Sequence, residues 1–224
     1  MSHTGLQVRS LVLEVLSDAS GKYKKDLLLQ KLGEHSISPL DHQFMTEFIN
    51  GVVRHSRTLS HVIKRYSHRP VTDGLIFNIL QMGLYQLLFM DRIPAYAAID
   101  TSVELAKRCH LCKEGKFINA LLRTVQRETE LLDSAVETPN VLPLPGGKCW
   151  DFKKNIFPNV RKDPYEYWAV VHSYPTSLVK KWNLQFGGKR CKELLVSGNC
   201  PPPIWIRPRR RSEEHTSELQ SRQS

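Results

Sequence analysis

The segment at residues 75–90 is the most apolar part of the chain and constrains the fold more than any other feature. It is interrupted by Asn78, Gln81 and Gln86, and it is shorter than the roughly 20 apolar residues that a helix needs to cross a bilayer. A helix that is apolar on nearly all sides is stable in water only when other helices surround it. The segment therefore predicts the central, buried helix of a bundle rather than a membrane span.

Helical periodicity extends on both sides of this segment, over residues 4–130. Apolar side chains recur there at spacings of three and four residues, and Gly33, Pro39, Pro70 and Pro94 separate the repeats. The apolar positions of the flanking helices are, in chain order, Val8, Val12, Val15 and Leu16; Leu27, Leu28 and Leu32; Phe44, Phe48, Ile49, Val52 and Val53; Leu59, Val62, Ile63 and Tyr66; Ala95, Ala98, Ile99, Val103 and Ala106; and Ile118, Leu121, Leu122 and Val125. No alternating strand pattern occurs over these residues, so we expect an all-α bundle over residues 1–131.

The composition changes after the last of these helices, where prolines and glycines become frequent. Residues 132–164 are therefore interpreted as a Pro/Gly-containing linker rather than as part of a core. Helical segments are expected around 176–186 and 188–197, and residues 204–206 resemble the opening of a strand. Because a single strand is not stable alone, residues 165–210 are expected to be the incomplete start of an α+β region.

The last residues, 211–224, show no apolar periodicity. The string RSEEHTSELQS within them resembles the conceptual translation of a sequencing-library adapter. We expect that this tail is an artefact and that the natural sequence is interrupted near Arg210. The alternative is a natural polar tail.

The chain carries a formal net charge of +10, from 32 Lys and Arg against 22 Asp and Glu. This excess favours a polyanionic partner, with RNA, DNA or an anionic membrane surface as candidates, although a merely soluble basic protein is an alternative. The first residues lack the apolar run of a signal peptide, and the five cysteines show no regular framework. The expected location is the cytoplasm.

Basic residues gather in groups along the expected helices. A solvated helix face explains any one of them, whereas contact with RNA phosphates better explains the groups together. The candidate RNA-binding residues are Arg9 in the first helix; Arg54, Arg57, Lys64 and Arg65 around the third; and Lys107, Arg108, Lys116, Arg123 and Arg127 towards the end of the bundle. Arg69 and Lys113 belong to the same groups, and Tyr96 is a candidate for stacking on a base.

Cys109 and Cys112 form a CxxC pair. With neither a second ligand pair nor a thioredoxin-like strand pattern nearby, the pair indicates ordinary packing rather than a metal or redox site. The sequence also has no glycine-rich turn between a strand and a helix that would hold a cofactor. We therefore expect no catalytic, metal-binding or cofactor-binding residues in this chain.

Two sets of segments resemble a known family. The first set is MGLYQLL at 82–88, IPAYAAI at 93–99, VELAK at 103–107 and KFINALLR at 116–123. In this order and spacing they resemble the core signature of the NusB/RsmB helical domain over about residues 6–130. One departure is Thr101, where relatives often carry an acidic residue.

The second set is HSYP at 172–175, LVKKW at 178–182, Gly187, LL at 194–195, Asn199 and PPPIWIR at 201–207. It resembles the region that joins the helical domain to the methyltransferase part of RsmB-type (Sun/Fmu) 16S rRNA cytosine-C5 methyltransferases. Stand-alone NusB antitermination factors end before such a region. Pro208 departs from the family, whose members usually continue with Val or Ile and then Asn.

The resemblance implies a longer parent whose Rossmann-like domain binds S-adenosylmethionine and uses a cysteine thiolate to attack the target cytosine. The five cysteines here do not stand in the Pro-Cys or Thr-Cys-Ser contexts of the family, so the chain as given is expected to be an inactive fragment without cofactor. Its implied function is RNA binding, with 16S rRNA as the partner. The alternatives are a NusB-like transcription antitermination factor that binds RNA and a protein partner, and a purely structural bundle.

Overall fold

Helix α5 (Gly74–Phe89) is the centre of the helical bundle, as its apolar sequence predicts. The computed structural model describes residues 5–20, 24–34, 37–133 and 136–200. The side chains of Ile79, Leu80, Met82 and Leu84 on α5 are fully buried. Asp73 caps the helix, because its carboxylate accepts hydrogen bonds from the backbone amides of Leu75 and Ile76 in the first turn.

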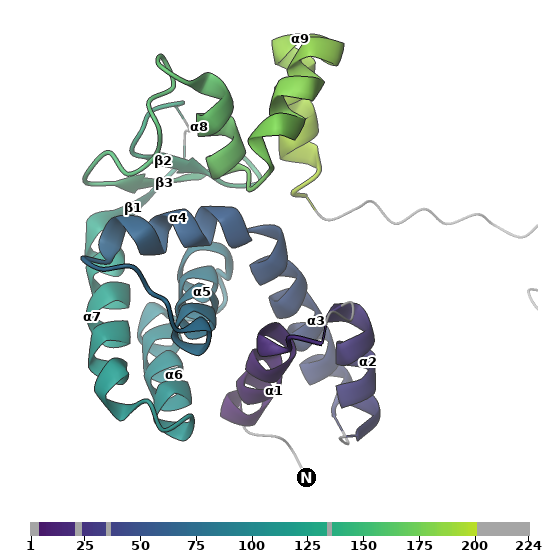
Figure 1. Ribbon diagram of the computed structural model, residues 1–224, viewed down its shortest axis with the longest axis vertical. Helices are drawn as coiled ribbons and strands as arrows, with labels where there is room; N and C mark the ends of the chain where they lie inside the picture. The colour runs from purple at the N-terminus through teal and green to yellow at the C-terminus, as the bar shows by residue number, and fades with distance from the viewer. Residues whose placement is uncertain (1–4, 21–23, 35–36, 134–135, 201–224) are drawn as a thin grey trace, which may run out of the picture.

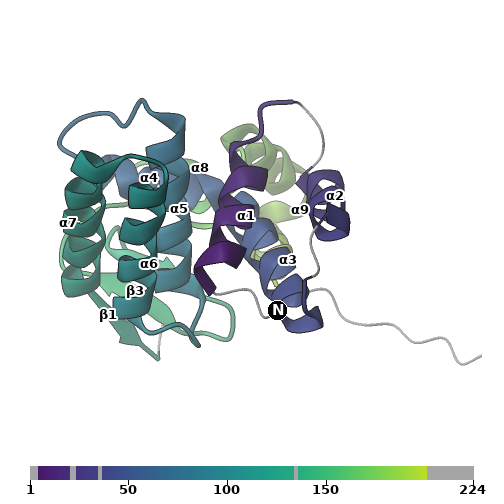
Figure 2. The ribbon, with the colours of Figure 1, turned by 90° about the horizontal axis from the view of Figure 1, so that it is seen from below.

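The bundle contains six further helices (Figure 1). They are α1 (Gly5–Ser17), α2 (Lys24–Glu34), α3 (Pro39–Arg54), α4 (Ser56–Tyr66), α6 (Ala95–Arg108) and α7 (Cys112–Glu128). All but α2 pack against α5, and α2 packs against α1 and α3. Seen from below, α1, α2 and α3 lie on one side of α5 and α6 and α7 on the other (Figure 2). The predicted helical bundle is confirmed, including the opening of α3 at Pro39 and the bend at His55 that separates α3 from α4. The fold of residues 5–128 is thus all-α.

Close contact between α3 and α5 depends on a glycine. A Cβ atom added at Gly51 would lie 2.0 Å from Cζ of Tyr85, well inside van der Waals contact. The Tyr85 ring has little room to move, because it stacks between Phe48 and Phe89 at centroid distances of 5.9 and 5.5 Å. The absence of a side chain at Gly51 therefore allows the tyrosine ring to fill the space between the two helices.

Residues 136–164 are packed against the bundle rather than forming the linker that the sequence suggested. Strand β1 (Thr129–Leu132) follows α7 directly, and β2 (Val141–Pro143) and β3 (Cys149–Phe152) follow it in the chain. The sheet order is β1-β3-β2 with antiparallel pairing, and it lies over α4 (Figure 1). Gly146 and Gly147, both at positive φ, form the turn between β2 and β3.

The sheet is anchored to the bundle by buried side chains. Phe152, Ile156 and Phe157 belong to the same buried cluster as the helices. The indole Nε1 of Trp150 donates a hydrogen bond of 2.7 Å to the carbonyl oxygen of Leu88 at the end of α5. The strands are only three or four residues long, so their alternation is too brief to be recognised among the surrounding prolines.

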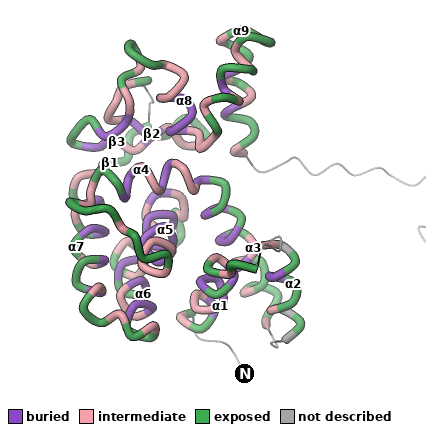
Figure 3. Tube along the Cα trace, viewed as in Figure 1, coloured by how far each residue is buried: buried purple, intermediate pink, exposed green. Residues whose placement is uncertain are grey.

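Two more helices follow the sheet. Helix α8 (Pro164–Val171) was not predicted; Asp163 caps it by accepting a hydrogen bond from the amide of Glu166. Helix α9 (Thr176–Ser197) contains the two predicted segments, because Gly187 adopts φ 76° and interrupts the helical backbone between them. Most of α9 is exposed (Figure 3), and its buried residues Val179, Cys191 and Leu195 are few.

The predicted strand at 204–206 and the adapter-like tail at 211–224 lie outside the described residues. Within the described ranges, none of the helices is both long and apolar enough to span a membrane.

Candidate nucleic-acid interface

Four cations form a row along one face of α7. Lys113, Lys116, Arg123 and Arg127, here called the α7 stripe, are all exposed. Their spacings of three, seven and four residues place them on one side of a helix, opposite the buried core residues of α7. At 1.5 Å per residue the stripe is about 21 Å long. The periodicity of the apolar residues predicts this exposure for Lys116, Arg123 and Arg127.

The cations of the α7 stripe keep their charge available for an external partner. Arg123 donates from Nε to the side-chain oxygen of Asn119 at 3.1 Å, and Arg127 donates from Nη2 to the hydroxyl of Thr124 at 3.4 Å. Neither acceptor is charged. Among the residues that the structure describes, no carboxylate forms an ion pair with any of the four. Such a row of uncompensated cations suits a chain of phosphates.

An exposed aromatic side chain lies beside the stripe. Phe117 follows Lys116 on α7 and retains 36% of its accessible surface. It lines a hollow of about 370 Å³ together with the loop that joins α4 to α5, including Arg69, Pro70 and Val71. An aromatic face next to cations is the usual platform for an unstacked base. The sequence analysis did not identify Phe117 as a candidate, although its position next to Lys116 on the same helix could have indicated it.

The end of α4 continues the basic surface on the other side of the same loop. Lys64 and Arg69 line a second hollow of about 380 Å³, which shares residues 67–71 with the first. Lys64 and its neighbour Arg65 are exposed. The structure thus brings the α4 cations and Phe117 to opposite sides of one short loop.

The two candidates at the end of α6 have different surroundings. Lys107 forms an ion pair with Glu104, and this hydrogen-bonded carboxylate raises the pKa of Lys107. Arg108 lines a hollow of about 310 Å³ beside α1, together with Glu14. Arg54, at the end of α3, is exposed.

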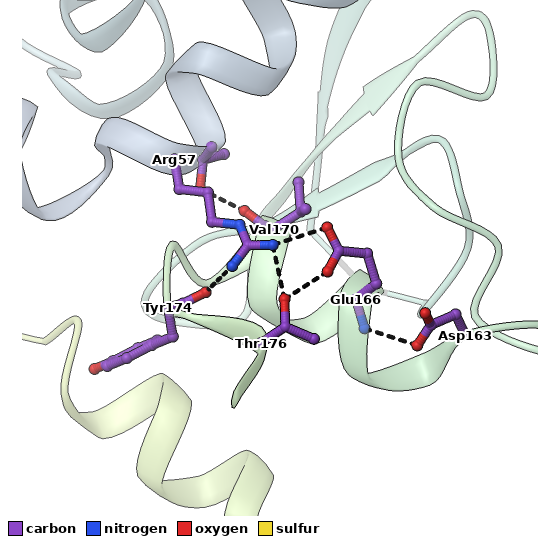
Figure 4. Close-up of polar contacts among 7 residues, drawn as sticks. Arg57, Asp163, Glu166, Val170, Tyr174 and Thr176 are labelled. Carbon is purple, nitrogen blue, oxygen red and sulfur yellow. Dashed lines mark hydrogen bonds and ion pairs between the residues drawn. The ribbon is translucent and has the colours of Figure 1, made fainter. Parts of the chain in front are cut away.

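Arg57 is directed into the protein rather than towards solvent (Figure 4). Its guanidinium donates to the carbonyl oxygen of Tyr174 at 2.6 Å, to Glu166 Oε1 at 2.8 Å and to Thr176 Oγ1 at 2.8 Å. The backbone amide of Arg57 also donates to Ser173 Oγ at 3.0 Å. These contacts join α4 to α8 and the start of α9, so Arg57 serves the junction of the two parts of the chain.

Arg9 is likewise held inside the bundle. Its Nε donates to Gln86 Oε1 on α5 at 2.8 Å, and its guanidinium lies 5.1 Å from the ring centroid of Phe44 on α3. Burial lowers the pKa of Arg9. We therefore leave Arg9 and Arg57 out of the candidate RNA-binding surface, because their donors are satisfied within the protein.

The cysteines and histidines form no second site in the described ranges. None of the five cysteines, all within the described residues, forms a disulfide, and burial raises the pKa of Cys109 and Cys191. A raised pKa disfavours the reactive thiolate. In the part of the chain that the structure describes, no group of three or more His, Cys, Asp or Glu side chains is placed to hold a metal ion.

A family model described as "NusB family" matches residues 6–127, which is more than half of the chain. The structure of Thermotoga maritima NusB, given as "T. maritima NusB", has a TM-score of 0.53 and 24% identity, and the match covers 57% of this chain and 94% of that one. This likeness concerns the fold of the helical bundle.

Longer relatives also match. The chain is 37% identical over 129 residues to a "Probable ribosomal RNA small subunit methyltransferase B" of Synechocystis sp., covering 56% of this chain and 29% of that protein. It is 35% identical over 176 residues to "Ribosomal RNA small subunit methyltransferase B" of Vibrio cholerae, covering 78% of this chain and 34% of that protein. The chain therefore spans about a third of the length of these methyltransferases.

A shorter relative matches over most of its own length. The "Transcription antitermination protein NusB" of Dehalococcoides mccartyi strain CBDB1 is 26% identical over 132 residues, which cover 57% of this chain and 92% of that protein. The Vibrio match covers 78% of the chain, so it extends beyond the family-matched segment.

Proposed function

Because the chain belongs to the NusB family, we propose that its helical bundle binds RNA through the α7 stripe, Phe117 and the end of α4. The observation that carries the proposal is the row of exposed cations without carboxylate partners in the described residues, next to an exposed aromatic ring. The cations would contact phosphates, and Phe117 would stack on an unpaired base. In this arrangement the α7 stripe supplies affinity for the RNA backbone, and Phe117 supplies a local preference for single-stranded RNA.

We propose further that the RNA is small-subunit ribosomal RNA, bound on behalf of a cytosine-C5 methyltransferase in the cytoplasm. The support is the match, at 37% and 35% identity, to two small-subunit rRNA methyltransferases, together with the sheet, α8 and α9 that follow the bundle. In that setting the bundle would hold the rRNA while another part of the parent protein carries out methyl transfer.

The described residues do not fit S-adenosylmethionine. The sheet consists of three antiparallel strands of three or four residues, whereas the Rossmann-like site requires parallel strands with a glycine-rich turn leading into a helix. We therefore assign the cofactor to the longer parent and derive no catalytic step from the residues of this chain.

A NusB-like antitermination role is the second candidate. It is favoured by the antitermination protein of Dehalococcoides mccartyi, 92% of which is covered by the match. In that role the bundle would bind RNA together with a protein partner. The sheet and the last two helices have no assigned part in it, which is why we place it second.

Binding of a labelled small-subunit rRNA fragment to the full chain, measured by fluorescence anisotropy over a salt series, tests the proposal. The affinity should fall steeply with salt, because each phosphate contact releases counterions. A Lys116→Gln/Arg123→Gln variant should bind more weakly and with a shallower salt dependence. Binding that is weak and insensitive to salt would contradict RNA binding altogether. Equal affinity for rRNA and for unrelated RNA would contradict the rRNA assignment.

A further inference from the structure

The turn after β3 lies against the C-terminal ends of α4 and α7. The backbone amide of Lys153 donates to the carbonyl oxygen of Glu128, the last residue of α7, at 2.8 Å. Arg65 at the end of α4 donates from Nη2 to the carbonyl oxygen of Asn155 at 3.2 Å. These bonds fix the turn at the point where α4, α7 and the sheet meet.

A third contact orients the neighbouring lysine. Nζ of Lys154 forms an ion pair of 3.0 Å with Glu128 Oε2 and lies 3.9 Å from the ring centroid of Tyr66. Lys154 thereby covers the aromatic ring and neutralises the carboxylate. Lys153 is left exposed, and it forms no ion pair with any residue that the structure describes.

The surface at this meeting point is strongly positive. It contains Lys64, Arg65, Lys153 and Lys154, here called the junction patch, and Arg127 of the α7 stripe precedes Glu128 directly. Within the described residues, Glu128 is the one carboxylate that forms an ion pair with a residue of the junction patch. Four cations against one carboxylate leave a surplus of positive charge, which an external anion would stabilise.

We propose that the junction patch extends the RNA-contacting surface of α4 and α7 onto the turn after β3, where it binds the phosphodiester backbone as it leaves the C-terminal end of α7. The patch has no free aromatic face, since Lys154 covers Tyr66. Its chemistry therefore fits phosphates rather than bases, so it positions the RNA without reading its sequence. This inference rests on the proposed RNA binding by α7.

The assignment extends the RNA path beyond the family-matched residues. The family model ends at residue 127, whereas Lys153 and Lys154 lie in the turn that follows strand β3. The path would run from Phe117 along α7 to the junction patch, so that the helical bundle and the sheet hold the same RNA strand. A stand-alone bundle that ended with α7 would lack this half of the junction patch.

The test compares three variants of the full chain with the unmodified chain, each with two cations changed to glutamine. Lys153→Gln/Lys154→Gln removes the half of the junction patch that follows β3 and that the proposed function does not include. Lys180→Gln/Lys181→Gln removes two exposed cations from α9 and is the matched control for net charge. Lys116→Gln/Arg123→Gln removes two cations of the α7 stripe and tests the proposed function by itself.

The measurement is the affinity for two fluorescein-labelled single-stranded RNAs of different sequence at several salt concentrations. For two lost phosphate contacts on single-stranded RNA, the slope of log K against log salt should become shallower by about 1.4. The junction variant should lose affinity by the same factor for both RNAs, and the α9 control should bind nearly as the unmodified chain does.

The outcomes separate the two proposals. If the α7 variant is weakened and the junction variant is not, RNA binding stands and the junction patch is refuted. If neither variant differs from the unmodified chain, the proposed function fails as well. An equal loss in the α9 control would show an effect of net charge only and overturn the patch, and a loss that depends on RNA sequence would overturn its assignment to phosphates.

Discussion

The guanidinium of Arg57 on α4 donates a hydrogen bond of 2.8 Å to the carboxylate of Glu166 on α8. Thr176, at the start of α9, accepts from the same guanidinium and donates to the other oxygen of Glu166 (Figure 4). Beside it, the hydroxyl of Thr58 donates to the carbonyl oxygen of Val170 at 2.7 Å. The helical bundle and the second part of the chain are thus connected by one polar cluster built around an arginine.

Replacing Arg57 with alanine should loosen this connection. The carbonyl oxygen of Tyr174 would lose its charged donor, and Glu166 would lose its ion pair. Both side chains of the pair are about one-third exposed, so solvent screening limits the cost to about 1–2 kcal/mol in unfolding free energy. Urea unfolding measures it, and Arg54→Ala, an exposed arginine on the same segment, is the control. If both variants lose the same stability, the cluster has no special role.

RNA affinity of the Arg57→Ala variant should remain close to that of the unmodified chain, provided that it is measured where the variant is folded. The reason is that Arg57 uses its donors inside the protein. A large loss of affinity with unchanged stability would place Arg57 in the RNA interface after all.

Gly51→Ala should destabilise the bundle. The new methyl group would lie 2.0 Å from Cζ of Tyr85, and the stacked rings of Phe48 and Phe89 prevent the tyrosine from moving away. Overpacking of this kind costs about 1–3 kcal/mol. The matched control is Gly33→Ala in α2, where no atom lies within 4 Å of the added carbon. There, the higher helix propensity of alanine should raise stability by about 0.5–1 kcal/mol, as thermal or urea unfolding can measure.

Phe117→Ala should weaken binding to single-stranded RNA without changing its salt dependence. Loss of one stacked base costs about 1–3 kcal/mol of binding free energy, whereas no phosphate contact is removed. The readout is anisotropy with the same labelled RNAs at several salt concentrations, and Phe186→Ala, which removes an exposed aromatic on α9, serves as control. A change in salt slope, or an equal effect of Phe186→Ala, would argue against stacking at Phe117.

The stability of the chain should decrease between about pH 6.5 and pH 4. Burial lowers the pKa of His55 and of His172 to about 4, from an ordinary value of 6.5. In this range the unfolded chain binds protons that the folded chain excludes, so acid favours unfolding, by at most about 1.4 kcal/mol per pH unit for each histidine. Urea unfolding at pH 7 and pH 5 checks this. A His172→Asn variant should show a smaller pH effect, and an unchanged effect would exclude His172 as a source.

Sequence periodicity was sufficient for the helical bundle because long amphipathic helices repeat the same signal several times. The sheet was misread as a linker since its strands hold only three or four residues and depend on partners far along the chain, as in the pairing of Leu131 with Trp150. Local sequence carries little of that information. Helix α8, with eight residues, was missed for a similar reason.

The candidate site was only partly predictable. The exposure of Lys116, Arg123 and Arg127 follows from the apolar residues on the opposite face of α7. The inward direction of Arg9 and Arg57 does not, because it depends on acceptors 77 and 109 residues away. Whether the exposed cations contact RNA stays a prediction for the binding experiments.

No residue lies between α7 and β1. Glu128 ends the helix, and Thr129 begins the strand with an extended backbone, at φ −120° and ψ 140°. The backbone of Lys153 then closes onto Glu128 from the neighbouring strand's end. Helix α7 and the sheet are therefore joined without an intervening loop, and the direction of α7 fixes the position of the sheet. An RNA strand bound along α7 would therefore meet the sheet at a fixed distance from the C-terminal end of the helix.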